Sequence, residues 1–341
     1  MVRLIISGVG HLMGVSRYKK RGEEMDVISI GETMVLFTPN TLGKIRYANQ
    51  YTSRIAGAET NTLIGLAKLG HQAGWISRLG RDEFGEMILN TVRGEGVDVS
   101  KVVIDETAPT GILFKEILNQ DAVNIYYYRK DSAASRLEPA DLDRDYIANA
   151  KYLYLSGITP ALSLSCRKVV FESIEIAKDN GLKIVFDPNI RRKLWDDKEA
   201  REVILEIAAK SDIVLPGISE CEFLFGTKEY GRAVQSFHEM GVEIVIIKLG
   251  EKGAYYSTTD SKGYIDSYPV KTVIDPVGAG DGFAAGVLSG LLDKLTISEA
   301  VKRGCAIGAM VCSTNGDIEG LPSKRELNQF FQSDLTDEVN R

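Results

Sequence analysis

The feature that most constrains the fold is an alternation of short apolar runs with helical segments, which begins near residue 25 and continues over most of the chain. Short strands separated by helices of 10 to 15 residues are typical of a largely parallel sheet that is covered by helices on both faces. The pattern therefore predicts the α/β class and one domain over residues 25–331, with no internal repeat or linker. Strands are expected at 26–32, 73–77, 152–157, 182–186, 212–215 and 243–248, and helices at 57–69, 82–93, 163–178, 197–210, 219–225, 234–240, 280–292, 298–313 and about 323–331.

Two β-rich regions interrupt this alternation. Residues 34–55 alternate polar and apolar side chains, and residues 107–130 contain two β-rich runs around an Asn119-Gln120-Asp121 turn. Together they are expected to form a small separate sheet, which would serve as a flap or lid or as a dimerisation surface. A third pair of short runs, 254–257 and 263–265, is typical of an antiparallel hairpin at the edge of the main sheet.

Composition excludes two classes of partner. The 341 residues carry a net charge of −6 and a pI near 5.4, which argues against nucleic acid and against a basic membrane-binding surface. No apolar run approaches the roughly 20 residues that span a bilayer. The four cysteines contain no CxxC pair and no metal-ligand spacing, so reduced thiols and a cytoplasmic location are expected. They are Cys166, Cys221, Cys305 and Cys312.

Residues 1–24 are expected to lie outside the fold. Leu4 to Gly10 imitates a strand that enters a dinucleotide-binding turn, but a charged segment follows in place of the helix that such a turn needs. We hypothesise that Met25 is the natural start and that 1–24 is an extension, and residues 332–341 are expected to be a tail. A dinucleotide-dependent oxidoreductase that uses the Gly8–Gly10 turn stays open as an alternative.

The stretch Gly278-Ala279-Gly280-Asp281 indicates the chemistry. Small residues at the start of a buried helix leave backbone N–H groups open to an anion, and the helix dipole favours negative charge there. A carboxylate at the same place would repel that anion, so Asp281 is interpreted as a general base. The alternative is a tight helix entry with an N-cap aspartate. No Walker motif (GxxxxGK[ST]) and no protein-kinase HRD motif is present.

Other polar clusters follow predicted strands. In a parallel sheet the carboxyl ends of the strands meet at one edge, where ligands bind. These clusters are therefore expected to converge with the glycine-rich stretch into one site. They are Asp187-Asn189-Arg191-Arg192, Ser219-Glu220 and Lys248-Gly250-Gly253.

The glycine-rich stretch and the segment Gly57-Ala58-Glu59-Thr60-Asn61 together resemble the two signature motifs of the ribokinase-like (PfkB) carbohydrate kinases, and the resemblance extends over residues 25–331. It implies a ribokinase-like fold with a β-sheet lid, ATP with Mg²⁺, and a homo-oligomer formed through the lid. It also implies that Asp281 removes the proton of the substrate hydroxyl while the backbone of Gly278, Ala279 and Gly280 forms the anion hole.

Within that family the chain is most similar to the 2-keto-3-deoxygluconate kinases, in the segments 126–135, 187–191 and 247–253. This similarity implies phosphorylation of a sugar acid at its terminal hydroxyl, with an arginine pair on the carboxylate. The implied sugar contacts are Gly57, Ala58, Asn61, Tyr127, Arg129, Arg191 and Asp281. The implied nucleotide contacts are Ser219, Lys248, Gly250, Gly253, Gly278, Gly280 and Asn315, with Glu220 as an indirect metal contact.

The chain departs from the family pattern at two positions. Leu113 stands where some relatives place a tyrosine against the substrate, and Gly217 replaces the asparagine of an Asn-x-x-Glu element that ends in Glu220. A fructokinase or a ribokinase is therefore kept as the nearest alternative. A non-catalytic sugar-binding protein on the same fold is disfavoured because Asp281 is present.

Overall fold

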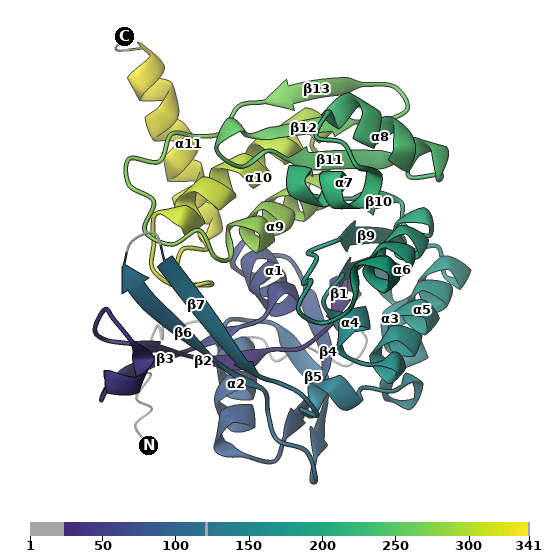
Figure 1. The fold of residues 1–341 in the computed structure, drawn as a ribbon. Coiled ribbons are helices and arrows are strands. Elements are labelled where there is room, and N and C mark those ends of the chain that lie inside the picture. Colours follow the sequence, from purple (N-terminus) through teal and green to yellow (C-terminus); the bar gives the residue numbers. More distant parts are fainter. Residues whose placement is uncertain (1–23, 120–121, 340–341) are drawn as a thin grey trace, which may run out of the picture.

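The computed structural model describes residues 24–119 and 122–339, and its centre is a nine-stranded sheet (Figure 1). From β11 to β5 in spatial order the strands run parallel, and β12 and β13 add an antiparallel edge. The spatial order is β13 (Lys262–Ile265), β12 (Ala254–Ser257), β11 (Ile244–Lys248), β10 (Ile213–Val214), β9 (Lys183–Asp187), β8 (Ala150–Ser156), β1 (Met25–Ile30), β4 (Ala73–Gly80) and β5 (Asp98–Asp105).

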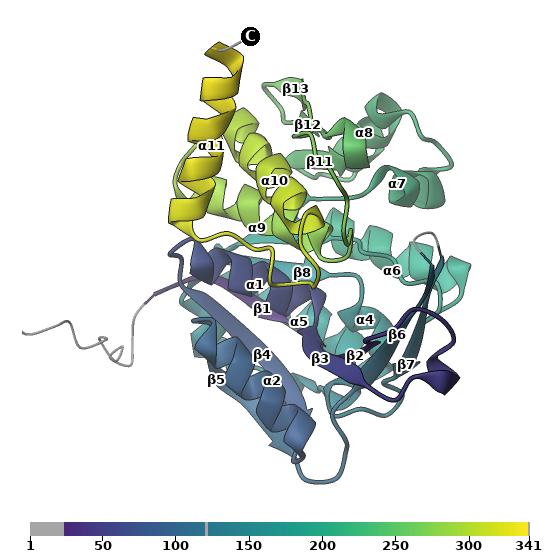
Figure 2. The same cartoon turned by 90° about the vertical axis from the view of Figure 1, so that its left-hand side faces the viewer.

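Helices cover both faces of this sheet because its strands are apolar on both sides. In β1, Val27 belongs to one hydrophobic cluster while Ile28 and Ile30 belong to the other. The first cluster packs under α1 (Ala58–Lys68), α2 (Glu83–Gly94), α9 (Ala279–Leu292) and α10 (Ile297–Cys312), with α11 (Lys324–Val339) beside them (Figure 2). The opposite face carries α3 (Arg144–Ala148), α4 (Thr159–Leu162), α5 (Leu164–Asp179), α6 (Asp197–Ala209), α7 (Ile218–Phe225) and α8 (Tyr230–Glu239).

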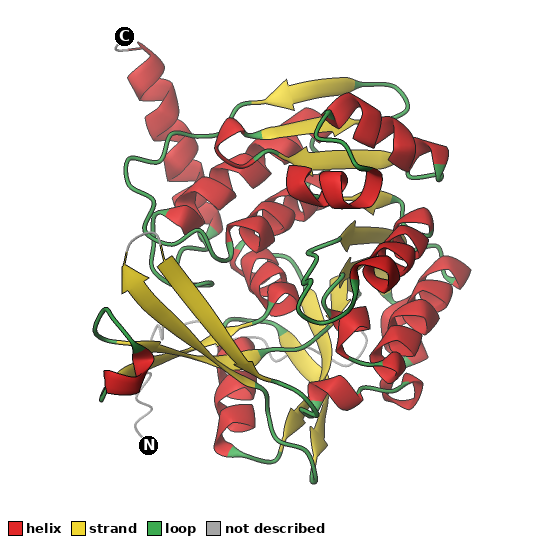
Figure 3. Cartoon of the chain, in the orientation of Figure 1, coloured by secondary structure: helices red, strands yellow, loops and turns green. Residues whose placement is uncertain are grey.

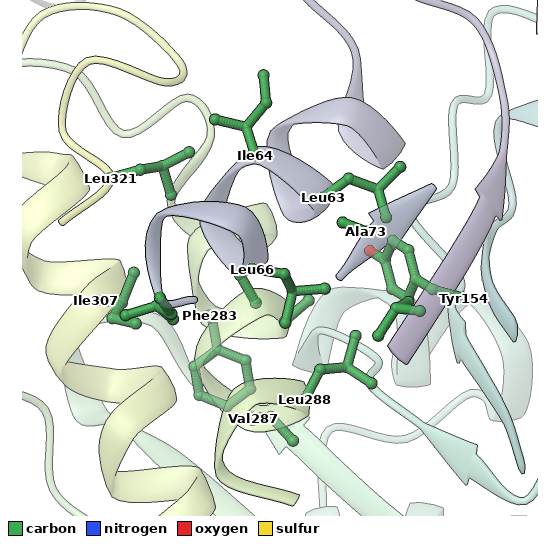
Figure 4. Close-up of a cluster of buried hydrophobic side chains, with 14 of the residues drawn as sticks. Leu63, Ile64, Leu66, Ala73, Tyr154, Phe283, Val287, Leu288, Ile307 and Leu321 are labelled. Carbon is green, nitrogen blue, oxygen red and sulfur yellow. The ribbon is translucent and has the colours of Figure 1, made fainter. Parts of the chain in front are cut away.

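The position of α9 is fixed by close packing against α1 and α10. Figure 4 shows Leu66 of α1 close to Phe283 and Leu288 of α9, and all three side chains are buried. Gly286 allows the helices to approach, because a Cβ at this position would lie 2.7 Å from the Cα of Gly304 in α10. Each large apolar side chain buried in this way contributes about 1.5–3 kcal/mol to folding. The amino end of α9 is therefore held rigidly relative to the sheet.

The lid is a second sheet of four strands, separate from the central one (Figure 3). Its order is β3 (Tyr51–Ala56), β2 (Met34–Pro39), β6 (Ile112–Asn119) and β7 (Ala122–Tyr128). Alternation along β6 and β7 points Leu113, Lys115, Ile125 and Tyr127 toward the central domain, where they line a cavity. The outer face carries aromatic contacts such as Phe37 with Phe114.

The predicted α/β class, the mostly parallel sheet, the small β-sheet and the edge hairpin are confirmed. Several elements differ from the prediction. β5 and the short helices α3 and α4 were not expected, and α11 continues to Val339 through most of the segment assigned to a tail. Nothing between 332 and 339 breaks a helix, since this stretch contains neither glycine nor proline. The prediction for residues 1–24 lies almost entirely outside the described residues. None of the helices in 24–119 and 122–339 is long and apolar enough to cross a membrane.

Candidate active site

The site lies at the carboxyl ends of the parallel strands, where the lid faces the amino end of α9. β9 ends at Asp187 and β11 ends at Lys248, and both side chains reach a cavity that the lid also borders. This cavity has a volume of about 380 Å³. A second cavity of about 610 Å³ lies on the other side of the 276–280 loop. Lys248, Pro276 and Gly280 border both cavities, so the two spaces meet at the start of α9.

The amino end of α9 has the geometry of an anion site. Gly278 caps the helix with a left-handed backbone (φ +80°), and a Cβ there would lie 2.7 Å from the carbonyl oxygen of Asp317. Only glycine meets both conditions without strain. A Cβ at Gly280 would have no neighbour closer than Lys248 Nζ, at 3.9 Å. An anion therefore has access to the first backbone N–H groups of α9 beside a lysine ammonium group.

Asp281 occupies the first turn of α9 and is buried. Burial raises the pKa of Asp281 to about 8, and the charges of Asp187 and Asp317 add to this rise, while a hydrogen bond from Asn61 and the charge of Lys248 oppose it. That bond joins Asn61 Nδ2 to Asp281 Oδ2 at 2.8 Å. A carboxylate with such a pKa is a stronger base than an ordinary aspartate, as general-base catalysis near neutral pH requires.

Asp317 is a second buried acid beside this pair, and the sequence analysis did not single it out. Asn61 Nδ2 also lies 3.5 Å from Asp317 Oδ2. Burial raises the pKa of Asp317 to about 6, with a further contribution from Asp275. Asn61 Oδ1 and Asp317 Oδ1 are buried without a hydrogen-bond partner among the described residues, although both residues border the smaller cavity. Buried polar atoms are rarely left unpaired, so these two oxygens are candidates for ligand hydroxyl groups.

Lys248 lies close to two acids, Asp187 at the end of β9 and Glu220 in α7. Its Nζ donates to Asp187 Oδ2 at 2.5 Å. Burial lowers the pKa of Lys248, but the charges of Asp187 and Glu220 outweigh this effect, and the pKa lies above its usual value. Glu220 accepts backbone hydrogen bonds from Gly217 (2.7 Å) and Ile190 (2.8 Å), and burial raises its pKa. Glu220 therefore fixes two loops of the site through both of its carboxyl oxygens.

Two arginines border the smaller cavity, and they differ in whether the side chain has an ion-pair partner. Arg129 is 9% exposed and pairs with Glu32, with Nε to Oε2 at 2.7 Å. Ser132 holds the other oxygen of Glu32, and the Arg129 guanidinium lies over the ring of Tyr127. Arg191 is exposed, and its guanidinium group forms no ion pair or hydrogen bond with the residues at 24–119 and 122–339. It is therefore available to an anionic ligand.

Most of the predicted site residues converge on the two cavities. Gly57, Ala58, Asn61, Tyr127, Arg129, Arg191, Glu220, Lys248, Gly278, Gly280 and Asp281 border the smaller cavity, and Gly250, Gly253 and Ala279 border the larger one.

Two of the predicted nucleotide contacts border neither cavity. Ser219 is exposed in α7, and Asn315 is exposed in the turn after α10. Leu113, which departs from the family pattern, does border the smaller cavity. Glu32, Lys115 and Asp317 border it as well and were not anticipated. Lys115 could have been anticipated from the sequence, because it lies on the otherwise apolar face of a predicted strand.

A metal ion would have few protein ligands here. No group of three or more potential ligands among His, Cys, Asp and Glu is present in the described part of the chain. Mg²⁺ commonly binds through one or two carboxylates and substrate phosphates. The acids around Lys248 fit that manner of binding, and the indirect role of Glu220 stays a prediction.

A buried acid at a helix amino end, beside the point where two cavities meet, is suited to the transfer of an anionic group to a hydroxyl. The pfkB family of carbohydrate kinases matches residues 25–324. The chain belongs to this family and is a sugar kinase, and the oxidoreductase alternative is thereby excluded as the activity of this domain.

Named relatives and a solved structure agree with this assignment. The chain is 40% identical to a 2-dehydro-3-deoxygluconokinase of Bacillus subtilis, over 92% of this chain and 97% of the relative. It is 34% identical to a 2-dehydro-3-deoxygluconokinase of Thermoproteus tenax, over 93% and 98%. It is also similar to a putative ribokinase II from E. coli solved in complex with ATP and Mg²⁺, with a TM-score of 0.85, 27% identity and coverage of 91% and 99%.

Proposed function

We propose that this sugar kinase is a cytoplasmic enzyme that transfers the γ-phosphoryl group of ATP to the terminal hydroxyl of 2-keto-3-deoxygluconate. This compound is also called 2-dehydro-3-deoxygluconate, the name that appears in the enzyme name of the two relatives. The product is 2-keto-3-deoxy-6-phosphogluconate. The observation that carries the proposal is the place of Asp281, a buried acid at the point where two cavities meet. The sugar acid occupies the smaller cavity and the nucleotide occupies the larger one.

The residues divide the reaction between them. Asp281 accepts the proton of the sugar hydroxyl. At the same time the hydroxyl oxygen bonds to the γ-phosphorus, and the bond between the γ-phosphorus and ADP breaks. Asn61 holds Asp281 through its amide group, at 2.8 Å. The backbone N–H groups of 278–280 and the nearby Lys248 stabilise the charge on the transferring group. Mg²⁺ neutralises the nucleotide phosphates when it is bound.

The acid group of the substrate is bound by the two arginines. The side chain of Arg191 has no partner in the described part of the chain, and Arg129 is oriented by Glu32 and Tyr127. Arg129 and Glu32 cancel one another in charge, so Arg191 leaves this part of the cavity with one net positive charge. That charge matches a single carboxylate, whereas a neutral sugar would leave Arg191 unpaired.

A substrate panel tests this proposal against the nearest alternative. With Mg·ATP, kcat/KM is expected to be highest for 2-keto-3-deoxygluconate and lower for fructose and ribose. A preference for a neutral sugar would instead support a fructokinase or a ribokinase. Asp281→Asn should lower kcat by about 10²- to 10⁴-fold, the range for loss of a general base, and near-normal turnover would remove Asp281 from that role.

We also propose that two copies associate through their lids. β7 is an edge strand, and its Tyr126 and Tyr128 are 43% and 64% exposed on the outer face. An exposed edge with large apolar side chains favours pairing with another chain. Sedimentation of the wild type and of Tyr128→Glu tests this, with a shift to smaller species expected for the variant. An unchanged monomer for both would contradict it.

A further inference from the structure

A buried ion pair joins the lid to the loop that precedes α9. Lys115 lies in β6, and its Nζ donates to Asp275 Oδ2 at 2.5 Å. Each of these side chains is 8% exposed. The other oxygen of Asp275 accepts the backbone N–H of Val277 at 3.2 Å. The lysine charge from the lid is therefore connected to the backbone one residue before Gly278.

The proposed function leaves this pair without a role. Its neighbours on the inner face of the lid include Leu113 and Ile125, which are apolar. Desolvating two charges costs more than their attraction returns in many proteins, and an apolar pair of similar size is often at least as stable. Asp275 also lies beside the loop that receives a phosphoryl group, where an unpaired carboxylate would repel it. The acid needs a cation, and that cation is carried by the lid.

We propose that Lys115 is a positioning residue that makes the 275–280 loop favourable for phosphate only while the lid is closed. With the lid closed, Lys115 neutralises Asp275 and holds the loop by its backbone. With the lid open, Asp275 is charged and unpaired, and it disfavours the triphosphate. The sugar acid holds the lid closed, so sugar and nucleotide each strengthen the binding of the other. This inference rests on the proposed function.

The pair differs from a second ion pair that joins the lid to the segment after α10. Arg54 of β3 pairs with Glu319 at 2.8 Å, but these side chains are 23% and 38% exposed. Water and salt weaken such a pair. Neither of its members contacts the 275–280 loop in the hydrogen bonds and ion pairs of the described residues. The coupling is therefore assigned to Lys115 and Asp275.

Calorimetry with Mg²⁺ and a non-hydrolysable ATP analogue, with and without 2-keto-3-deoxygluconate, tests the inference. In the wild type the sugar acid should tighten binding of the analogue by about tenfold, within the range of measured couplings. Asp275→Asn removes the charge but keeps an oxygen for Val277. Its affinity for the analogue without sugar should approach the affinity of the sugar-bound wild type. The sugar effect, which is the ratio of the Kd for the analogue without sugar to the Kd with sugar, should therefore fall toward one.

Three further variants complete the test. Lys115→Met should bind the analogue more weakly than the wild type even with sugar, because Asp275 keeps its charge. The double variant Lys115→Met/Asp275→Asn buries no unpaired charge, and it should bind as Asp275→Asn does. Lys101→Met is the matched control, since Lys101 pairs with Asp143 at 2.5 Å outside the lid, and it should retain the wild-type sugar effect.

The inference is overturned if the wild type shows no sugar effect on the analogue, or if Asp275→Asn and the double variant both keep it. Should Lys115→Met fail to fold, the double variant still decides. A wild type that phosphorylates no sugar acid refutes the proposed function instead. Phosphorylation of the acid with an unaltered sugar effect in the variants refutes only the role of Lys115.

Discussion

Asp281→Asn is predicted to stabilise the folded protein, and to do so more strongly as the pH rises. The pKa of Asp281 is raised from 3.8 to about 8 in the folded protein. Below about pH 4 the carboxyl group is protonated in both the folded and the unfolded state, and it has no effect on the difference between them. Between these two pKa values the unfolded chain loses the proton and the folded protein keeps it. The free energy of unfolding therefore falls as the pH rises, by about 1.4 kcal/mol per pH unit from this group.

The size of the effect follows from these two pKa values. At pH 7 the buried acid costs on the order of 4 kcal/mol of folding free energy. Asparagine cannot ionise, and its side-chain oxygen still accepts the hydrogen bond from Asn61. For a chain of this length 1 kcal/mol corresponds to about 1.5 °C in Tm, so the variant should melt about 6 °C higher at pH 7.

Unfolding of the wild type and of Asp281→Asn from pH 5 to pH 8.5, without ligands, measures this difference. Asp260→Asn, in an exposed turn, controls for changes in total charge. The stability gap between Asp281→Asn and the wild type should widen steadily up to about pH 8. A gap that is constant or that narrows with pH would refute the claim that burial keeps Asp281 protonated.

Three further predictions concern activity and access to the cavities. The kcat/KM for the sugar acid should increase with pH up to about 8, because the basic form of Asp281 becomes more abundant, and a flat profile from pH 6 to pH 9 would contradict this. Arg191→Gln should raise KM for the sugar acid by about 10- to 100-fold, the range for a hydrogen bond to a charged group, with little change in KM for ATP. Arg192→Gln is its control, because Arg192 is paired with Asp197, and equal effects of both substitutions would argue against Arg191. Cys312 borders the larger cavity and burial raises the pKa of its thiol, so alkylation by N-ethylmaleimide should be slow and should slow further with ADP, whereas labelling that ignores ADP would place the nucleotide elsewhere.

The elements that could be predicted are those whose pattern is strong within a single segment. The strands of the sheet interior are continuous apolar runs, and α1, α5 and α9 begin at recognisable capping or glycine positions. β5 was missed because it is an edge strand in which Ser100 and Lys101 interrupt the apolar residues, and this mixture resembles a loop.

The site residues that lie in a short motif could be predicted, whereas those whose role depends on an ion pair with a distant residue could not. Gly278 and Asp281 lie in one short motif, so local spacing was enough. The partners of Arg129 and Lys115 are Glu32 and Asp275, which lie 97 and 160 residues away in the sequence. Nothing in a single sequence reports such distant contacts. The unpaired oxygen of Asp317 depends in the same way on what surrounds it in the fold.

The contact between Gly278 and the backbone of Asp317 limits how substrate preference is able to change. Because the carbonyl oxygen of Asp317 would lie only 2.7 Å from a Cβ at Gly278, the loop that carries Asp317 has no room to move toward the helix without displacing the proposed anion hole. Substitutions on this side of the sugar would therefore disturb turnover together with selectivity. Arg191 lies in a separate loop, and its side chain has no partner to lose among the described residues. Efforts to redirect the enzyme to other sugars, in the laboratory or by natural divergence, should succeed first at the Arg191 loop.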